Sequence, residues 1–115
     1  MNPYDLTALT TMCGGDPSFM RDFIQLFIDT TPPNLESMKE YRQNKKWVEV
    51  GEILHKIKPT VELFGMNHII TEIKLAERAG RYGHDLDQMD SWLDHIVPQL
   101  EEALAALKEE VKKYG

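Results

Sequence analysis

The feature that most constrains the fold is the spacing of apolar residues between positions 45 and 65. At about 100° per residue, these side chains fall on a single stripe of a helix: Trp47, Val50, Leu54, Ile57, Val61 and Phe64. Such a stripe predicts a helix that packs one face on a core. His55 lies roughly 140° from the centre of the stripe, so we expect its imidazole to face water.

The chain before this stretch carries two helix signals. A short helix is predicted over residues 3–12, and the pair Gly14 and Gly15 ends it. Asp16 is a good N-cap, and Pro17 suits the first position of the next helix, because a proline has no N–H to leave unpaired there. The apolar face of this second helix is predicted to contain Phe19, Phe23, Ile24, Phe27 and Ile28.

Two adjacent prolines divide the rest of this region. Pro32 and Pro33 each lack a backbone donor and clash with the preceding turn, so we expect the helix to end or bend near residue 31. Apolar residues at helical spacing then predict a further helix over residues 35–44. The sequence therefore predicts two helical segments before the central stretch, separated by a break or a bend at the prolines.

After the central helix, Gly65 is predicted to reverse the chain. An antiparallel helix is expected over residues 69–79, and it stops near residues 80–83, where glycines interrupt the pattern. Because the two helices run in opposite directions from one turn, residues at similar distances from Gly65 should lie at similar levels.

A last long helix is predicted to begin at Asp85 or Asp87 and to run to Val111. Pro98 should kink this helix, unless the bend merely follows the curvature of the bundle. No segment alternates apolar and polar residues with β-branched enrichment, so no strand is expected. Short connections between amphipathic helices favour an antiparallel bundle, and the predicted fold class is all-α. The acidic residues along the last helix are interpreted as a solvated face.

Composition sets the outer limits on function. A chain of 115 residues, 42% hydrophobic and 28% charged, is predicted to form a single globular domain over residues 1–115. Its net charge of −6 argues against a nucleic-acid partner, because binding phosphates needs a basic face. The single cysteine, Cys13, excludes an internal disulfide and a cysteine-based zinc cluster.

The sequence gives no sign of export or of a membrane. The opening segment MNPYDLTALTT lacks a basic region followed by an apolar run, so no signal peptide is expected. No apolar stretch approaches about 18 residues, so we expect no membrane span and a cytoplasmic protein. Glycine-rich phosphate loops and nucleotide motifs are also absent, and we therefore expect no cofactor and no ATP-dependent kinase activity.

The central helix carries a group of residues with a characteristic spacing. His55, Ile57, Lys58 and the small residue Pro59, with Gly65 ten residues after the histidine, resemble the signature of histidine-containing phosphotransfer domains. That family has a histidine, an aliphatic residue two positions on, a lysine three on, a small residue four on and a glycine near ten on. The resemblance covers nearly the whole chain, because an opening such as LTALTTMCGGDPSFMRDFIQLFIDTTP is also typical of the family.

The resemblance implies an antiparallel four-helix bundle with additional short N-terminal helical segments. It also implies a phosphorelay carrier that is not an enzyme: His55 would accept a phosphoryl group from an aspartate of a receiver domain and pass it to another receiver. The implied partners are receiver domains of response regulators and the receiver of a hybrid histidine kinase, and the carrier is expected to be a monomer. Pro59 departs from the glycine usual in the family, but it keeps the position small.

Further residues have predicted roles around the histidine. Lys58 lies one turn after His55 and is the candidate for holding phosphate oxygens. Glu77 matches an acidic or amide residue that family members often place on the following helix, so we expect it to orient the imidazole. The receiver-docking surface is predicted to comprise Val48, Gly51, Glu52, Lys56, Pro59, Glu62 and Arg81.

Two alternatives remain open. The bundle could be a protein-interaction module without phosphotransfer, in which His55 is an incidental surface residue. His68 and Glu72, four residues apart, could chelate a metal, but no third ligand follows at matching spacing, and His84 and His95 are scattered. Acceptance of an acid-labile, base-stable phosphoryl group distinguishes a carrier from an interaction module.

Overall fold

The computed structural model describes residues 2–114, and all regular secondary structure in that range is helical. The all-α prediction is therefore confirmed for these residues. Single turns of 3₁₀-helix, η1 (Leu86–Gln88) and η2 (Val111–Lys113), lie on either side of the last α-helix. The α-helices are α1 (Thr7–Met12), α2 (Pro17–Gln43), α3 (Trp47–Leu63), α4 (Asn67–Tyr82) and α5 (Met89–Glu110).

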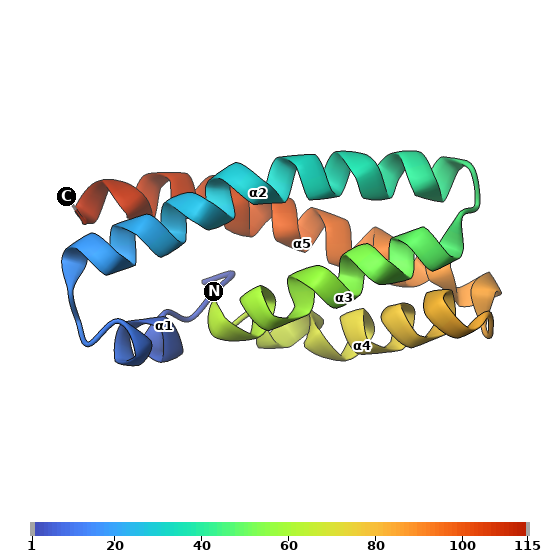
Figure 1. Cartoon of the computed structure of the whole chain (residues 1–115), viewed down its shortest axis with the longest axis horizontal. Helices are drawn as coiled ribbons and strands as arrows, with labels where there is room; N and C mark the ends of the chain where they lie inside the picture. Colours follow the sequence, from blue (N-terminus) through green and yellow to red (C-terminus); the bar gives the residue numbers. More distant parts are fainter. Residues whose placement is uncertain (1, 115) are drawn as a thin grey trace.

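The four long helices lie side by side along the length of the molecule (Figure 1). Helix α3 packs on α4, α4 on α5, and α2 on both α3 and α5. The longest, α2, has 27 residues and at 1.5 Å per residue spans about 40 Å, which accounts for the 43 Å long axis of the molecule. Within residues 2–114, no helix is both long and apolar enough to cross a lipid bilayer.

The predicted stripe of α3 forms part of the core. Val50, Leu54, Val61 and Phe64 are buried, while Trp47 and Ile57 are partly buried against the same core. Phe64 stacks on Phe27 of α2, with ring centroids 5.0 Å apart. The opposite side of α3 faces solvent, and the side chain of His55 is 57% exposed. The predicted orientation of α3 is therefore confirmed.

A single helix replaces the two that were predicted around the proline pair. Helix α2 passes through Pro32 and Pro33 without a break but changes direction near the middle of its length (Figure 1), so of the predicted end or bend near residue 31 only the end is wrong. Both prolines are exposed, and water can bond the carbonyls that they leave without a donor. Thr31 and Met38, on either side of them, are buried in one core, which keeps the helix continuous across the prolines.

The first helix is shorter than predicted and begins at Thr7. The carboxylate of Asp5 accepts hydrogen bonds from the Thr7 backbone N–H, at 2.9 Å, and from the Thr7 hydroxyl, at 2.6 Å. The backbone N–H of Asp5 donates to the Phe64 carbonyl, at 3.0 Å. The last of these contacts ties the segment before α1 to the α3–α4 turn. This segment therefore does not extend α1 toward the N-terminus.

The start of the last α-helix and the position of Phe19 differ from the predictions. Asp85 has φ +53°, a left-handed conformation, so the last α-helix begins later, at Met89, after the turn η1. Phe19 was expected on the inner face of α2, but 57% of it is exposed. Helix α5 continues through Pro98 as an unbroken helix.

Helices α3 and α4 come close together at two glycines. A Cβ atom at Gly80 would lie 2.5 Å from the carbonyl oxygen of Trp47, and one at Gly51 would lie 2.9 Å from the backbone nitrogen of Arg81. Neither distance leaves room for a side chain. Gly51 is buried in this contact, so its predicted position on an exposed surface is wrong.

We predict that Gly80→Ala destabilises the protein by about 1–3 kcal/mol, because the added methyl group meets a backbone carbonyl of α3 that cannot move freely. Helix propensity alone would predict the opposite effect, an increase in the free energy of unfolding of up to about 1 kcal/mol. Urea denaturation followed by circular dichroism measures the difference. Thr71→Ala, at an exposed position of the same helix, is the control and should change stability little. A Gly80→Ala protein as stable as the wild type would contradict the close contact.

Candidate functional site

A buried carboxylate joins α3 and α4 below His55. The side chain of Glu77 is only 5% exposed, and it is the one buried charged residue within residues 2–114. Its Oε1 lies 2.5 Å from Nδ1 of His55 and 3.2 Å from Nη1 of Arg81, and its Oε2 lies 2.7 Å from Nζ of Lys58. A charge taken out of water is costly unless it is paired, and these three partners satisfy both oxygens.

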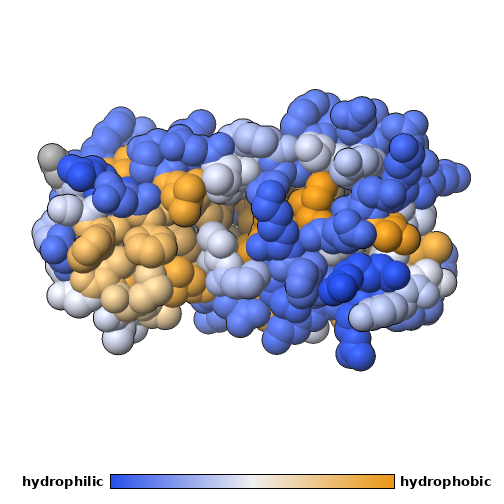
Figure 2. All heavy atoms as spheres, in the orientation of Figure 1, coloured by the Kyte–Doolittle hydropathy of each residue, from blue (hydrophilic) through white to orange (hydrophobic). Residues whose placement is uncertain are grey.

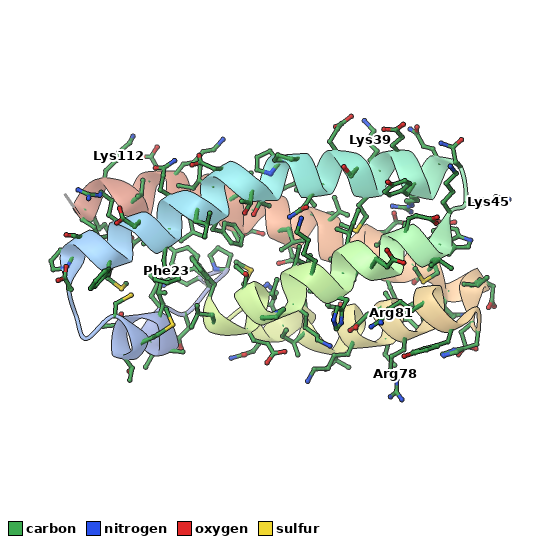
Figure 3. All side chains as sticks on the ribbon, viewed as in Figure 1. Phe23, Lys39, Lys45, Arg78, Arg81 and Lys112 are labelled. Atoms are coloured by element: carbon green, nitrogen blue, oxygen red, sulfur yellow. The ribbon has the colours of Figure 1, made fainter. Side chains whose placement is uncertain are left out.

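The arrangement follows from helical spacing. His55 and Lys58 lie one turn apart on α3, and Glu77 and Arg81 lie one turn apart on α4. The turn at Gly65 brings the two pairs to the same level, as the sequence predicts for His55 and Glu77. Figure 3 shows Arg81 directed from α4 toward α3, whereas Arg78, on the same helix, points away into solvent. We call His55, Lys58, Glu77 and Arg81 the His55 cluster.

The contacts of Nδ1 decide which nitrogen of His55 is available for chemistry. Glu77 can only accept a proton at Nδ1, whereas Arg81, 3.2 Å away, can only donate one. The two interactions exclude each other on a neutral ring, and the much shorter contact, with the carboxylate at 2.5 Å, sets the tautomer. We infer that Nδ1 carries the proton, that Arg81 donates to Glu77 instead, and that Nε2 keeps its lone pair.

The electrostatics of the cluster favour an ionised Glu77. Burial raises the pKa of the Glu77 carboxyl, but hydrogen bonds from Lys58 and His55, the charge of Lys58 and the hydrogen bond from Arg81 outweigh it. The pKa of Glu77 is therefore lowered, and the carboxylate stays charged beneath the imidazole at neutral pH.

Lys58 is already bound to Glu77, although the sequence assigns it to phosphate. An ammonium group has three donors, and the contact with Oε2 of Glu77 uses one of them. The side chain of Lys58 is partly exposed, so its other donors can bind a ligand at His55 while the contact with Glu77 is kept. The structure is thus compatible with both roles of this lysine.

The residues predicted to form the docking surface divide into three groups. Gly51 is buried in the helix contact, and Arg81 belongs to the His55 cluster, where its guanidinium contacts both Glu77 and the imidazole. The sequence analysis did not predict that role, although the spacing of four residues from Glu77 is a signal for it. The remaining residues are exposed on α3: Val48, Glu52, Lys56, Pro59 and Glu62.

Pro59 does not interrupt α3, which runs from Trp47 to Leu63. Its ring lies on the exposed side, one turn after His55, and it removes the backbone hydrogen bond that the His55 carbonyl would otherwise accept. The side chain stays compact, so the approach to the imidazole from solvent remains open.

Among residues 2–114, the structure places no third metal ligand beside the predicted pair His68 and Glu72. Glu72 does not pair with His68; its carboxylate contacts Nδ1 of His95, on α5. Nδ1 of His84 lies 3.1 Å from the exposed carboxylate of Asp85. No group of three or more His, Cys, Asp or Glu side chains is arranged to hold a metal ion among the residues that the structure describes.

Comparisons with known proteins add no assignment. The chain shows no match to models of known protein families, to characterised proteins or to solved structures. The function must therefore be argued from the His55 cluster itself.

We predict that Glu77 gives the protein an acid-sensitive part of its stability. Because the folded-state pKa of Glu77 is lowered, its ionised form stabilises the fold fully above the pKa of the unfolded chain, about 4.5, and this contribution is lost as pH falls through the lower folded value. Glu77→Gln lacks it. The difference in unfolding free energy between the wild type and Glu77→Gln should therefore shrink as pH falls from about 5.5 to about 3.

Urea denaturation of both proteins at a series of pH values tests this prediction. These pH values lie below the range in which histidines ordinarily titrate, so a change in histidine charge does not contribute to the difference. Glu62→Gln, at an exposed position of α3, is the matched control, and its difference from the wild type should stay small. A difference for Glu77→Gln that does not change with pH would contradict the buried, paired carboxylate.

Proposed function

We propose that this protein is a phosphorelay carrier, which accepts a phosphoryl group on His55 from a receiver-domain aspartate and passes it to another receiver. One observation carries the proposal: an exposed imidazole whose Nδ1 is held by a buried carboxylate, which leaves Nε2 open to solvent. The residues around it also fit the signature of histidine-containing phosphotransfer domains. A buried carboxylate is costly, and a surface histidine of no function does not require one.

The transfer step needs little from the protein beyond positioning and charge. The lone pair of Nε2 attacks the phosphorus of the aspartyl phosphate in line; the N–P bond forms as the P–O bond breaks, and the aspartate leaves as a carboxylate. The ring still carries its proton on Nδ1, so positive charge develops on it. Glu77, 2.5 Å away, stabilises that charge. Transfer to the next receiver is the reverse of this step.

Lys58 and Arg81 have complementary parts in this proposal. Both bind Glu77 and compensate for its burial, so the carboxylate stays ionised and in place. Lys58 also lies one turn from His55 and can bind phosphate oxygens with its remaining donors. The pair thus links the orientation of the imidazole to the binding of the phosphoryl group.

The fold and the partners follow from the same proposal. Helices α2 to α5 form the antiparallel four-helix bundle of the family, and α1 is the additional N-terminal segment. The receiver supplies the metal ion and the acidic pocket that hold the aspartyl phosphate, and the carrier docks through the exposed face of α3. It acts as a cytoplasmic monomer without ATP-dependent kinase activity of its own.

The first test of the proposal uses phosphoramidate, a small phosphoryl donor that needs no partner. We predict that His55 is phosphorylated at least tenfold faster than His84, although both imidazoles are exposed and both contact a carboxylate through Nδ1. His55→Gln should remove the fast, acid-labile label without changing the helical circular dichroism, and His84→Gln should retain it. Peptide mapping by mass spectrometry assigns the label. Equal labelling of the two histidines would contradict the proposed site.

The second test concerns docking and separates a carrier from an interaction module. Pro59→Arg should block transfer from the labelled protein to a panel of receiver domains with Mg²⁺, because the long side chain projects beside His55. Labelling by phosphoramidate should persist, since the small donor needs no docking surface. Ala105→Arg, at an exposed position of α5, is the matched control and should transfer normally. Transfer by Pro59→Arg at the wild-type rate would show that receivers do not approach over this face.

A further inference from the structure

A pocket of about 440 Å³ lies between α2 and α3, and no residue of the His55 cluster lines it. Its apolar walls include the rings of Phe23, Phe27 and Phe64 and the aliphatic side chains of Leu26 and Ile57. Both the volume and the mostly apolar lining fall within the range of pockets that bind small molecules. Of the residues that the proposed phosphotransfer involves, only Lys56, on the docking face of α3, also lines this pocket.

The pocket lies beside the proline pair of α2. Pro33 is part of its wall, and α2 changes direction near the middle of its length (Figure 1). A proline within a helix displaces the turn before it, so α2 does not lie parallel to α3 along its whole length. The space between the two helices is therefore a consequence of the sequence of α2.

The mouth of the pocket is bordered by exposed apolar side chains. Leu26 lines the pocket and is nevertheless 57% exposed, and Phe19, two turns earlier on α2, is equally exposed. Figure 3 shows Phe23 between α2 and α1, on the side of α2 that faces α3. A broad apolar area covers this end of the molecule in Figure 2, whereas the other end is largely hydrophilic. An apolar ligand could thus enter without displacing charged groups.

Polar groups with no partner occupy one side of the pocket. Lys56, which is exposed, and Thr60, which is partly buried, lie one turn apart on α3, and both line the pocket. Neither side chain has a hydrogen bond or an ion pair within residues 2–114. Among residues 2–114, Lys56 is the only cation in the lining and Asp29 the only carboxylate. Asp29 lies on α2 and accepts a hydrogen bond from Gln25 at 2.9 Å. The α3 side therefore offers an ammonium and a hydroxyl to an anion.

We propose that this pocket binds a small amphipathic carboxylate, an aliphatic or aromatic acid whose body lies among the phenylalanines and whose carboxylate meets Lys56 and Thr60. Apolar walls favour the body, and a charge-assisted hydrogen bond from the ammonium selects the head group. A water molecule takes up about 30 Å³ in the liquid. If each non-hydrogen atom of a ligand takes up the same volume, the pocket holds a ligand of roughly 15 such atoms. The proposal does not depend on phosphotransfer.

Three probes with the same alkyl chain test the proposal: octanoate, octan-1-ol and octylammonium. Each is titrated into the ¹⁵N-labelled full chain and followed by ¹H–¹⁵N NMR. Octanoate should bind saturably, shift the amide signals of Leu26, Ile57 and Thr60, and bind at least fivefold more tightly than the other two. Lys56→Gln should reduce the affinity for octanoate to that for octan-1-ol and leave the affinity for octan-1-ol unchanged.

Three further variants make the result decisive. Leu26→Glu places a charge at the mouth of the pocket at an exposed position, so it should fold normally and weaken octanoate binding at least fivefold. Lys74→Gln, at an exposed position of α4, is the matched control for Lys56→Gln and should bind octanoate as the wild type does. His55→Gln should also bind normally, which separates this site from the phosphotransfer site. Absence of saturable binding, equal affinity for the three probes, or unchanged octanoate binding by Lys56→Gln would overturn the proposal.

Discussion

The ionised carboxylate of Glu77 is the interaction on which the site depends. It is almost completely removed from water, and its charge is compensated by Lys58 and His55 from α3 and by Arg81 from its own helix. Breaking such a buried pair by removing one partner typically costs about 3–5 kcal/mol, because the remaining charge is left uncompensated. The partners are therefore held in place, and the orientation of the imidazole is a consequence of electrostatics and not of local packing around an exposed ring.

The glycines at the contact of α3 and α4 make this arrangement geometrically possible. Gly51 and Gly80 let the two backbones approach until a Cβ would clash. Gly65 turns the chain with φ +63°, and it also lies so close to the segment before α1 that an added Cβ would be 2.4 Å from the carbonyl oxygen of Asp5. A wider separation would move Glu77 away from Nδ1 of His55. The small residues thus set the distance between the helices, and that distance sets the chemistry available at the surface of α3.

The sequence predicted the elements that depend on periodicity. The exposed position of His55 and the level of Glu77 follow from helical spacing and from one tight turn, and both were found. Three features escaped because they depend on contacts between helices: α2 continues through Pro32, Gly51 is buried, and Arg81 joins the cluster. A local rule for proline assumes that a helix must supply its own stability, whereas here a common core holds both halves. The burial of Gly51 and the contacts of Arg81 likewise depend on where the neighbouring helix lies, which the local sequence does not give.

We propose that Glu77 holds the proton of His55 on Nδ1 and leaves Nε2 as the nucleophile. Two-bond ¹H–¹⁵N NMR of histidine-labelled protein at about pH 8.5, above the ordinary titration range of histidine, reads the tautomer of each ring directly. We predict that His55 is protonated on Nδ1 in the wild type and that Glu77→Ala loses this preference. A wild-type His55 protonated on Nε2, with Arg81 donating to Nδ1, would contradict it.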